Sequence, residues 1–581
     1  MEITLDCSHS LELLLIETAR SVDGFEEDFV PQVRAADERF GDFQANGVLP
    51  YAKRTGNNPR EMAQQLIDAI PPSRNWETTI AGPGFINFKL SKTFLLKWLD
   101  HFNSTTKIQD ALREGKAGIT VVDFSSPNTA KQMHVGHIRS TIIGDSLARL
   151  LSFSGHEVIR DNHLGDWGTQ FGILLYAIKR EGVSLEELGE DPIAELENLY
   201  RKGTAWSKDE ESALKESRAE LVQLQEGKPK NLELWQKIKD ISMESFHAIY
   251  ELLGVRFDFA HGESYYRDRV DHIYKSLLAH KICEENEGAL VVFHPEHKRF
   301  SKQPFLVRKS DGASNYATTD LATLSFRKEE WQADRIIYVT DGRQRDHFEQ
   351  LFLTARKWFK AEEISIPELN HVWFGTILGE DNKAIKTRDG QPVKLSDLLE
   401  EAIRRAKNMV LEKNPNLEEQ EAQRRAQIIG LGAVKYADLS QDRTLDYVFS
   451  WDKLLALQGN TAPYLQYAVA RINSIFRKLE KEPLELTESA RPPESEHERS
   501  LARRLTFFPM ALKQTLRELK PHFLCTYLYE LATEFSSFYN QEKVMVEDSD
   551  AQALRIILCL RTKTYLCAGL DILGIEILDE M

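Results

Sequence analysis

Cysteine is scarce in this sequence, and its few copies are not arranged to hold a metal or a disulfide framework. The 581 residues include five cysteines, none of them spaced as Cys-x-x-Cys. Zinc modules need closely spaced ligands, so the sequence predicts no structural zinc. Unpaired thiols are typical of reducing compartments. The cysteines are Cys7, Cys283, Cys525, Cys559 and Cys567.

Long apolar runs and targeting segments are also missing. No window approaches the roughly 18 uninterrupted apolar residues of a membrane span. The N-terminus, Met1 to Cys7, has neither a basic segment followed by an apolar core nor an Arg-rich presequence. We therefore expect a cytoplasmic protein without a membrane partner.

Positive charge is in deficit, since the formal net charge is −16. A polyanionic partner needs local lysines and arginines, so this total argues at first against nucleic acid. An acidic protein can still carry basic faces, and ordinary solvated helix faces are the alternative interpretation of the same residues. The candidates are Arg503, Arg504, Lys513, Arg517, Lys520 and residues 561–563.

The chain is long enough for three to five folding units. Residues 1–112 mix helix, strand and turn signals, which indicates an N-terminal α+β domain. Residues 113–425 alternate strands and helices, which predicts a Rossmann-like, doubly wound parallel sheet with a charged helical insertion at about 183–260. Residues 426–581 have helical periodicity and predict an all-α domain. The strands expected in the sheet are 118–124, 157–161, 335–340 and 371–378.

One polar turn stands where an α/β enzyme binds phosphate. The segment from Ser125 to His137 follows an apolar strand and precedes an amphipathic helix expected at 138–152. His134 and His137 therefore lie at the positive end of a helix, where backbone N–H groups and imidazoles can bind an anion. Gly136 lets a base or sugar approach the backbone. A pair of surface or capping histidines is the alternative.

A second polar loop strengthens the prediction that the turn belongs to a ligand site. Residues 161–172, Asp-Asn-His-Leu-Gly-Asp-Trp-Gly-Thr-Gln-Phe-Gly, follow the next expected strand. Loops at the carboxyl ends of parallel strands line the crevice in which open α/β sheets bind ligands. Together the two loops predict a nucleotide site.

These motifs resemble those of the arginyl-tRNA synthetases, a family of class I aminoacyl-tRNA synthetases. The resemblance starts with Ser-Pro-Asn at 126–128, Lys131 and His-Val-Gly-His at 134–137, and continues with Gly-Asp-Trp-Gly at 165–168. Further blocks agree in order along nearly the whole chain: 316–322, 434–440, 459–468, 527–531 and 538–539.

The resemblance implies that arginine and ATP form arginyl-adenylate and pyrophosphate, and that the arginyl group then passes to the terminal adenosine of tRNA(Arg). Mg²⁺ is expected to accompany ATP. His134 and His137 would donate hydrogen bonds to phosphate rather than act as bases, while Gly136 and Met133 would also contact ATP. Activation of this kind depends on positioning and on stabilising phosphate charge.

The second ATP motif of class I enzymes, usually Lys-Met-Ser-Lys-Ser, departs from the pattern here. Residues 383–390 lack its leading Lys-Met-Ser. In relatives with this loss, a lysine just before the first motif is thought to supply the missing charge, and Lys131 holds that position. We predict a catalytic Lys131, with Lys386, Thr387 and Arg388 on a mobile loop; a plain surface lysine is the alternative for Lys131.

The substrate's guanidinium needs planar, bidentate acceptors, which carboxylates provide. Asp123 and Asp320 match the family's acidic ligands, although Asp123 is shorter than the glutamate of some relatives. The alternative for Asp320 is a helix cap before Leu321. The resemblance also assigns arginine contacts to Ser126, Asn128, His137, Tyr316 and Gln344.

The resemblance implies two regions that bind tRNA. Tyr464, Tyr467 and Arg471 belong to a predicted helical anticodon-binding domain, where exposed aromatics can stack on unpaired bases, although most of its aromatics should be core. Phe85 and Asn87, expected side by side on an exposed strand face, match residues that recognise an unstacked D-loop base.

Three rival interpretations stay open. A cysteinyl-tRNA synthetase is disfavoured by the absence of zinc-ligand cysteines and by the paired aspartates. A smaller nucleotidyltransferase would leave both flanking domains unexplained, and an RNA-binding protein that lost activity would not need intact catalytic residues. We expect a monomer, because the resembled family is usually monomeric.

Overall fold

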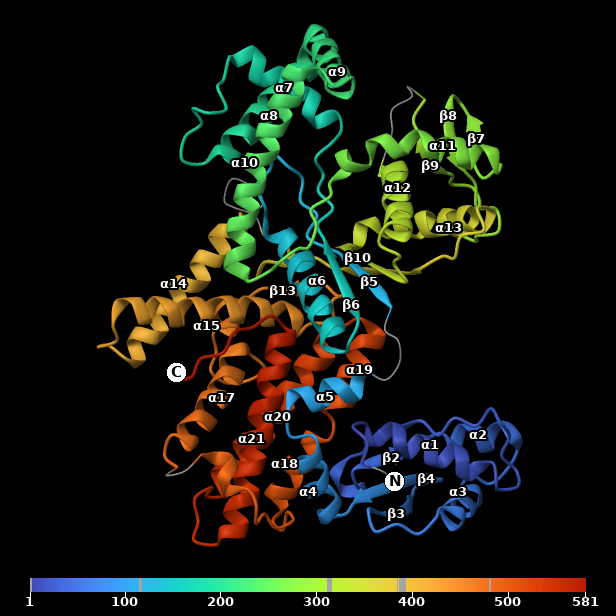
Figure 1. The fold of residues 1–581 in the computed structure, drawn as a ribbon, viewed down its shortest axis with the longest axis vertical. Helices are drawn as coiled ribbons and strands as arrows, with labels where there is room; N and C mark the ends of the chain where they lie inside the picture. Colours follow the sequence, from blue (N-terminus) through green and yellow to red (C-terminus); the bar gives the residue numbers. More distant parts are fainter. Residues whose placement is uncertain (1–2, 114–117, 311–315, 384, 386–392, 480–481) are drawn as a thin grey trace.

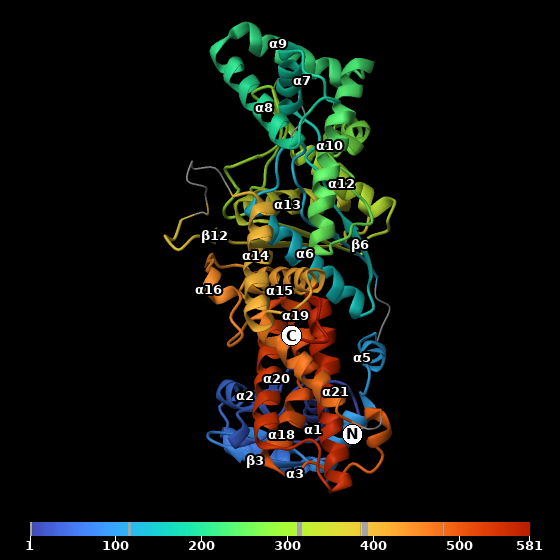
Figure 2. The ribbon, with the colours of Figure 1, turned by 90° about the vertical axis from the view of Figure 1, so that its left-hand side faces the viewer.

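The computed structural model describes residues 3–113, 118–310, 316–383, 385, 393–479 and 482–581. The molecule is elongated, with a parallel sheet near its middle and a helical insertion at one end (Figure 1). The N-terminal unit and the C-terminal helices lie side by side at the other end in both views (Figures 1 and 2). No helix of the described residues is long and apolar enough to cross a membrane.

The central sheet has four parallel strands in the order β11-β10-β5-β6. These are β5 (Ile119–Asp123), β6 (Glu157–Asp161), β10 (Arg335–Asp341) and β11 (Glu368–Phe374), so the four strands expected from the sequence are present. The fourth is shorter at its end than the expected 371–378. At Gly375 the chain turns to hydrogen-bond with Arg443, and β12 (Ile377–Leu378) pairs instead with β13 (Tyr447–Val448).

Helices cover both faces of this sheet, as the doubly wound prediction requires. Val122 faces the core that includes α6 (Val135–Phe153), whereas its neighbour Val121 faces the core of α12 (Tyr316–Glu329) and α13 (Arg345–Ala361). Alternate strand residues point to opposite faces, which explains why the adjacent apolar residues Val121 and Val122 in β5, and Ile336 and Ile337 in β10, each serve both cores. The chain reverses its direction of winding between β5 and β10, and ligands bind at such a switch point.

The insertion between β6 and β10 begins with helices. It continues with a small antiparallel sheet that the sequence did not predict. Helices α7 (Thr169–Glu181), α8 (Pro192–Asp209), α9 (Glu211–Gln225) and α10 (Pro229–Leu253) enclose a core of their own. After η2 (Glu263–Arg269) and α11 (Val270–Ala279) comes a three-stranded antiparallel sheet. Its strands, β7 (Glu284–Asn286), β8 (Ala289–Val292) and β9 (Phe305–Arg308), are too short to produce a clear alternating pattern.

The N-terminal unit is an antiparallel sheet of order β1-β2-β4-β3 with helices packed on it. Its elements are α1 (Cys7–Ala19), β1 (Val33–Ala35), η1 (Glu38–Phe40), β2 (Phe43–Ala45), α2 (Val48–Thr55), α3 (Pro59–Ala69), β3 (Trp76–Ala81) and β4 (Phe85–Leu90). Two further helices, α4 (Lys92–His101) and α5 (Thr105–Leu112), pack against the C-terminal helices rather than against the central sheet.

The expectation that Asn87 is exposed is wrong. Strand β4 lies between β2 and β3, so Asn87 has Gln44 on one side and Thr79 on the other. Its Oδ1 accepts a hydrogen bond of 2.7 Å from the Gln44 amide, and only 2% of the residue is exposed. A short side chain in the middle of a sheet is shielded by its longer neighbours, which strand alternation alone does not predict.

The described residues of the C-terminal part form helices and loops apart from β13, and the helix α15 (Glu419–Leu439) spans an expected boundary. The division expected between residues 425 and 426 falls inside α15, which is continuous. The helices are α14 (Leu395–Lys413), α15 (Glu419–Leu439), α16 (Trp451–Leu454), α17 (Ala462–Phe476), η4 (Pro483–Leu486), α18 (Glu496–Leu505), α19 (Phe508–Glu518), α20 (His522–Gln541) and α21 (Ser549–Ile572).

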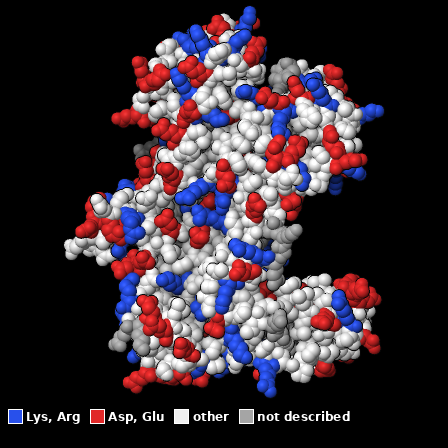
Figure 3. All heavy atoms as spheres, viewed as in Figure 1, with Lys and Arg blue, Asp and Glu red and all other residues white. Residues whose placement is uncertain are grey.

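Two arginines proposed for a basic face are buried instead. Arg503 is 4% exposed and forms an ion pair of 3.1 Å with Asp42 of the N-terminal unit. Arg561 is also 4% exposed and donates to the backbone oxygens of Leu99 and Asn103. Both side chains thus fasten the N-terminal unit to the helical domain. On the face shown in Figure 3, basic and acidic side chains are intermixed.

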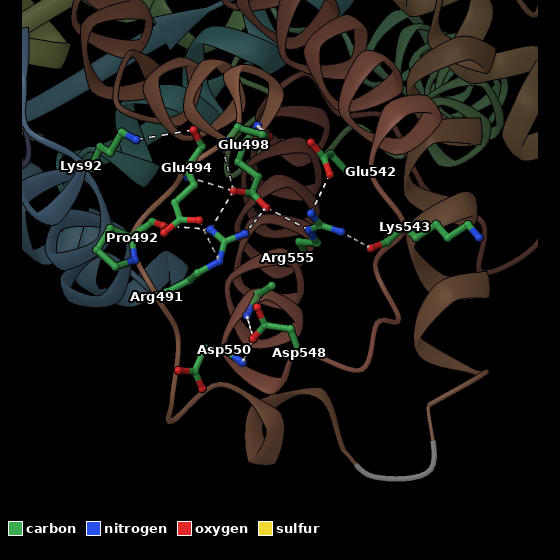
Figure 4. Close-up of polar contacts among 12 residues, drawn as sticks. Lys92, Arg491, Pro492, Glu494, Glu498, Glu542, Lys543, Asp548, Asp550 and Arg555 are labelled. Atoms are coloured by element: carbon green, nitrogen blue, oxygen red, sulfur yellow. Dashed lines mark hydrogen bonds and ion pairs between the residues drawn. The ribbon is translucent and has the colours of Figure 1, made fainter.

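Glu498 is the centre of a buried polar network within the helical domain (Figure 4). Its carboxylate accepts from Arg491 at 2.9 and 3.0 Å and from Arg555 at 2.9 Å, and it also accepts the backbone N–H of Glu494. Burial alone would raise the pKa of Glu498, but these donors outweigh it and lower the pKa to about 2. The network ties the proline-rich segment before α18 to α21.

Candidate functional site

The two histidines of the first motif are held by each other's backbone. Helix α6 begins at Val135, three residues earlier than expected, with His134 as its N-cap. The Gly136 N–H donates to Nδ1 of His134, and the His134 N–H donates to Nδ1 of His137, both at 3.0 Å. Because each Nδ1 accepts, a neutral ring carries its proton on Nε2.

Both imidazoles are electrically neutral near pH 7. Burial lowers the pKa of His137 to about 3, with the neighbouring His134 and Lys131 acting in the same direction. Burial also lowers the pKa of His134, assisted by Arg343. The motif therefore presents two fixed Nε2–H donors. The centroids of the two imidazole rings are 4.1 Å apart. Each ring can therefore donate from Nε2, while its Nδ1 already accepts a backbone N–H.

Gly136 is required by the His134 ring itself. A Cβ added at Gly136 would lie 2.7 Å from Cε1 of His134, closer than real carbon atoms approach. Any larger residue would therefore displace the ring. The exposed backbone at Gly136 also leaves room for a ligand, as the sequence suggested.

A cavity of about 420 Å³ opens beside this turn. It lies between the start of α6 and the carboxyl ends of β10 and β11, at the switch point of the sheet. Arg139 on its wall is buried and pairs with Asp438 at 2.9 Å, so that its charge is held in place. The lining residues are His134, Val135, Gly136, Arg139, Asp341, Arg343, 374–377 and Ile385.

Lys131 lies at the edge of this site, and its charge is close enough to act on both histidines. The residue is exposed, and its Nζ sits 5.4 Å from the ring centroid of Tyr200 in α8. The preceding Ala130 is buried with φ of 60°, a left-handed conformation that costs about 1–3 kcal/mol and clusters at functional sites.

The Ser-Pro-Asn loop is strained in the same way and held by the loop after β6. Ser125 and Ser126 have φ of 70° and 48°. The Ser126 N–H donates to Asn162 at 3.0 Å, and its hydroxyl donates to Asp123 at 3.0 Å. Asn128 is exposed and forms a bridge to Gly165, where any side chain would meet its amide oxygen.

Asp123 is already neutralised by a residue of the protein. Its Oδ2 lies 2.6 Å from the guanidinium of Arg327, which is fully buried and also contacts Asp161 at 2.7 Å. The arginine comes from α12, whereas the two aspartates end β5 and β6. This triad links the ends of β5 and β6, where the two loops begin, to α12. The Asp123 carboxylate, which the sequence suggested for a substrate guanidinium, is therefore already paired with Arg327.

Asp320 lies inside α12, so the helix-cap alternative for it is wrong. Its Oδ2 is 2.5 Å from Nε2 of His347, and its Oδ1 is 4.0 Å from Nε2 of His163. No arginine or lysine pairs with it among the described residues. The carboxylate is therefore available to a cation.

Glu263 is a candidate that the sequence did not reveal. Burial raises the pKa of its carboxyl to about 8, and the charges of Asp320 and Asp166 add to this effect. No donor to its carboxylate is found in the described part of the chain. Lys239 pairs with Asp166 at 2.7 Å, whereas no lysine or arginine of the described residues pairs with Glu263 or Asp320. A largely desolvated acid near a second carboxylate that lacks such a partner is suited to a cationic ligand.

The Gly-Asp-Trp-Gly motif explains how Glu263 is positioned. Asp166 is fully buried and accepts both the backbone N–H and the hydroxyl of Ser264, at 2.9 and 2.7 Å. The Glu263 N–H donates to the Leu164 oxygen at 3.0 Å. Because Glu263 and the motif are far apart in sequence, only the fold could connect them.

The other predicted residues are placed as follows. Gln344 is exposed at the end of η3 (Gly342–Gln344), directly after β10. Met133 is 3% exposed and packs in the core, so it lies behind the cavity; its oxygen accepts the Leu395 N–H at 2.9 Å. The backbone of Tyr316 begins α12, and its side chain is outside the description. Lys386, Thr387 and Arg388 lie outside the described residues.

An exposed aromatic and basic cluster lies on the helical domain. The Arg471 guanidinium is 4.6 Å from the ring centroid of Tyr467 and 5.0 Å from that of Tyr539, which is 37% exposed. Tyr464 is instead engaged internally, with its hydroxyl 3.1 Å from that of Ser536. Phe85, at the start of β4, is partly exposed.

Metal-ligating side chains do not gather in the part of the chain that the structure describes, where no group of three or more could hold an ion.

Three family models match successive parts of the chain. Residues 101–451 match the catalytic domain of class I tRNA synthetases (R). Residues 465–581 match the DALR anticodon binding domain, and residues 9–90 match the arginyl tRNA synthetase N terminal domain.

Individual relatives agree over nearly the full length. An arginine–tRNA ligase from Escherichia fergusonii is 42% identical, covering 98% of this chain and 100% of that protein. One from Laribacter hongkongensis is 43% identical over 94% of this chain and 95% of that protein. The solved arginyl-tRNA synthetase of Plasmodium falciparum is 29% identical with a TM-score of 0.84, covering 100% of both chains.

Proposed function

The chain belongs to the arginyl-tRNA synthetase family and is an arginine–tRNA ligase, and from this premise we propose how its residues divide the work. In the first step the arginine carboxylate attacks the α-phosphorus of ATP, and the bond to the bridging oxygen of pyrophosphate breaks. In the second step a hydroxyl of the terminal adenosine of tRNA takes the arginyl group, and AMP leaves.

We assign ATP to the cavity beside the first motif. His134 and His137 donate from Nε2 to phosphate oxygens, and Gly136 keeps the His134 ring in place. Lys131 supplies positive charge toward the leaving pyrophosphate, together with Lys386, Thr387 and Arg388 of the second motif. Mg²⁺ enters with ATP as part of the nucleotide substrate, because Mg²⁺ is usually held by phosphates with few protein ligands. No structural zinc is part of this proposal.

The observation that carries the ATP assignment is a pair of hydrogen bonds: the Nδ1 atom of each histidine ring accepts a backbone N–H. It fixes both rings and leaves one donor on each. Donors that are already oriented stabilise developing phosphate charge without reorganising.

We assign the substrate guanidinium to Asp320 and Glu263. Two carboxylates without a lysine or arginine partner can accept a planar, five-donor cation. Asp123 then has a supporting role, because Arg327 occupies one of its oxygens. Ser126, Asn128, His137, Tyr316 and Gln344 remain proposed contacts around the rest of the amino acid.

We assign tRNA(Arg) to both flanking regions. The half-buried Tyr467 and Arg471, beside the exposed Tyr539, offer stacking surfaces for anticodon bases, with Tyr464 supporting α17 from within. Phe85 offers a ring on the N-terminal unit, while the buried Asn87 would act through Gln44 unless the strand rearranges. A Phe85→Ala variant should then raise the KM for tRNA while the KM values for arginine and ATP stay unchanged.

We further propose that the enzyme works as a cytoplasmic monomer with three functional regions, close to residues 1–112, 113–425 and 426–581. Gel filtration with light scattering tests the monomer, since a second copy would double the mass.

The activation step tests the central assignments. Arginine-dependent exchange of pyrophosphate into ATP, measured with and without tRNA, should require His137 and Lys131. Loss of an oriented donor to a reacting phosphate typically lowers kcat by about 100-fold or more. Normal exchange in His137→Ala would overturn the histidine assignment, and normal exchange in Lys131→Ala would make Lys131 a surface lysine. An inactive wild-type chain that still binds tRNA would favour an RNA-binding protein without catalysis.

A further inference from the structure

The helical insertion touches the phosphate-binding turn at three separate points. Lys131 packs on Tyr200 of α8, with its Nζ 5.4 Å from the ring centroid. Gln132, the next residue, donates to both oxygens of Asp191, at 3.1 and 2.8 Å. The backbone N–H of the left-handed Ala130 donates to the hydroxyl of Ser242 in α10 at 2.9 Å.

Asp191 connects this turn to the second ATP motif as well. Its Oδ2 lies 3.1 Å from Nζ of Lys394, which directly follows the segment containing the second motif. Lys394 also forms a β-bridge with His134, and the Val135 N–H donates to the Val393 oxygen at 3.0 Å. One carboxylate of the insertion therefore holds both chain segments that flank the ATP site.

The same carboxylate is fixed to its own helix. Asp191 is the N-cap of α8, and its Oδ1 accepts the Ala194 N–H at 3.0 Å. Burial alone would raise its pKa, but the Ala194 N–H and Lys394 outweigh burial and lower the pKa, so the carboxylate is ionised at neutral pH. A rigid cap makes Asp191 a fixed point for the flexible Gln132 and Lys394 side chains.

The α8 surface that carries Tyr200 faces the ATP site. Glu197, one turn before Tyr200, is close enough for its charge to act on His134. Lys131 and Tyr200 also line one small cavity of about 10 Å³, together with Thr129, Ala130, Gln170, Phe171 and Leu174. In Figure 1, α8 lies with α7 and α10 at the end of the molecule above β5 and β6.

We propose that the insertion is part of the ATP-activating machinery: Tyr200 positions Lys131, and Asp191 fastens Gln132 and Lys394 on the two sides of the histidine turn. The proposal rests on the assignment of Lys131 as the phosphate-binding cation. Tyr200 and Asp191 are positioning residues, because neither contacts the reacting atoms. A free lysine side chain samples many conformations. Contact with the Tyr200 ring restricts the conformations of Lys131 before ATP binds.

Tyr200 is tested by two substitutions that separate the ring from the hydroxyl. Tyr200→Phe keeps the aromatic face and should retain wild-type pyrophosphate exchange in the presence of tRNA. Tyr200→Leu keeps apolar bulk and should lower kcat/KM for ATP about two- to fivefold, the usual strength of an exposed cation–π contact. The KM for arginine and the melting temperature should not change, whereas a merely structural defect would move all of them.

A double-mutant cycle distinguishes this proposal from the assignment on which it rests. If Tyr200 acts through Lys131, Tyr200→Leu should have no further effect in a Lys131→Ala background. An equal loss in both backgrounds, or a gain of activity in Tyr200→Leu alone, would overturn the role of Tyr200 and leave Lys131 as the cation. Wild-type activity in Lys131→Ala alone would instead overturn the assignment of Lys131.

Asp191→Asn tests the second contact without removing the helix cap, since asparagine also caps helices. It should lower kcat/KM for ATP about two- to fivefold, as expected for the loss of a partly exposed charge pair. The matched control is Glu195→Ala on the same helix, whose carboxylate accepts the Gly189 N–H at 2.8 Å and no other hydrogen bond from the described residues. Equal effects of the two substitutions, or none from Asp191→Asn, would refute a fastening role for Asp191.

Discussion

Arginine binding should release a proton, because Glu263 is protonated in the free enzyme. Burial and the charges of Asp320 and Asp166 raise the pKa of Glu263 to about 8. A bound guanidinium would supply the missing positive charge and favour the carboxylate. The substrate guanidinium stays charged throughout this range, so the proton must come from the protein.

The size of the effect follows from that pKa. With a pKa of about 8, roughly half of the Glu263 carboxyls are ionised at pH 8, about a tenth at pH 7 and about a hundredth at pH 6. If only the ionised form binds arginine well, the apparent dissociation constant rises about fivefold from pH 8 to 7 and about tenfold from pH 7 to 6. Binding at pH 7 should release about 0.9 proton.

Calorimetry of arginine binding at pH 7, in two buffers with different ionisation enthalpies, measures the released proton directly. Glu263→Gln should abolish the release and weaken arginine binding at pH 8 by about 10- to 100-fold, as expected for a lost charged hydrogen bond. Asp268→Asn is the matched control, since Asp268 lies on the same 3₁₀ turn and its side chain is 90% exposed. A wild-type affinity that does not change between pH 6 and 8, with no proton released, would refute this reasoning.

Three further predictions follow from single contacts. Asp320→Asn should raise the KM for arginine about 10- to 100-fold in pyrophosphate exchange, and a wild-type KM would refute its role. Gly136→Ala should lower kcat about tenfold or more, because its Cβ would displace the His134 ring; steady-state kinetics would show a larger change in kcat than in the KM for ATP. Glu498→Gln should lower the unfolding free energy of the helical domain by about 3 kcal/mol at pH 7, since its pKa of about 2 lies well below the usual 4.5. That stabilisation is complete above pH 4.5 and is lost as the pH falls toward 2, so urea titrations at pH 7 and pH 3 should show a smaller difference between variant and wild type at the lower pH.

Strong periodic signals made the sheet predictable from the sequence. β5 and β10 carry adjacent apolar residues that face opposite sides, and β6 has the apolar pair Val158 and Ile159 between charged residues. Polar loops follow β5 and β6, so these positions could be assigned without structural information. The short strands β7 to β9 offered no such pattern. The expected division at residues 425–426 lies within the continuous helix α15, because helical periodicity does not show where one domain ends.

Burial of polar groups was the main source of error. Asn87 and Arg503 have residue types that are usually exposed, yet each has a partner from another strand or domain: Gln44 for the first and Asp42 for the second. Such pairs join residues far apart in the chain, and local sequence patterns contain no information about them. The histidine motif was predictable because its hydrogen bonds are local, between residues two and three positions apart.

The arginine site that we propose shows the same limit at the level of charge. The sequence reveals which residues are acidic, but a carboxylate can bind a cation only if the protein has not already neutralised it. Arg327 takes one oxygen of Asp123 and one of Asp161, the two acids that end β5 and β6. Asp320 and Glu263 have no such partner in the described residues, and burial together with the charges of Asp320 and Asp166 raises the pKa of Glu263. Because Arg327 pairs with Asp123 and Asp161, Asp320 and Glu263 are the acids that we propose for the substrate guanidinium. That arrangement depends on how β5, β6, α12 and η2 fold together rather than on any one motif.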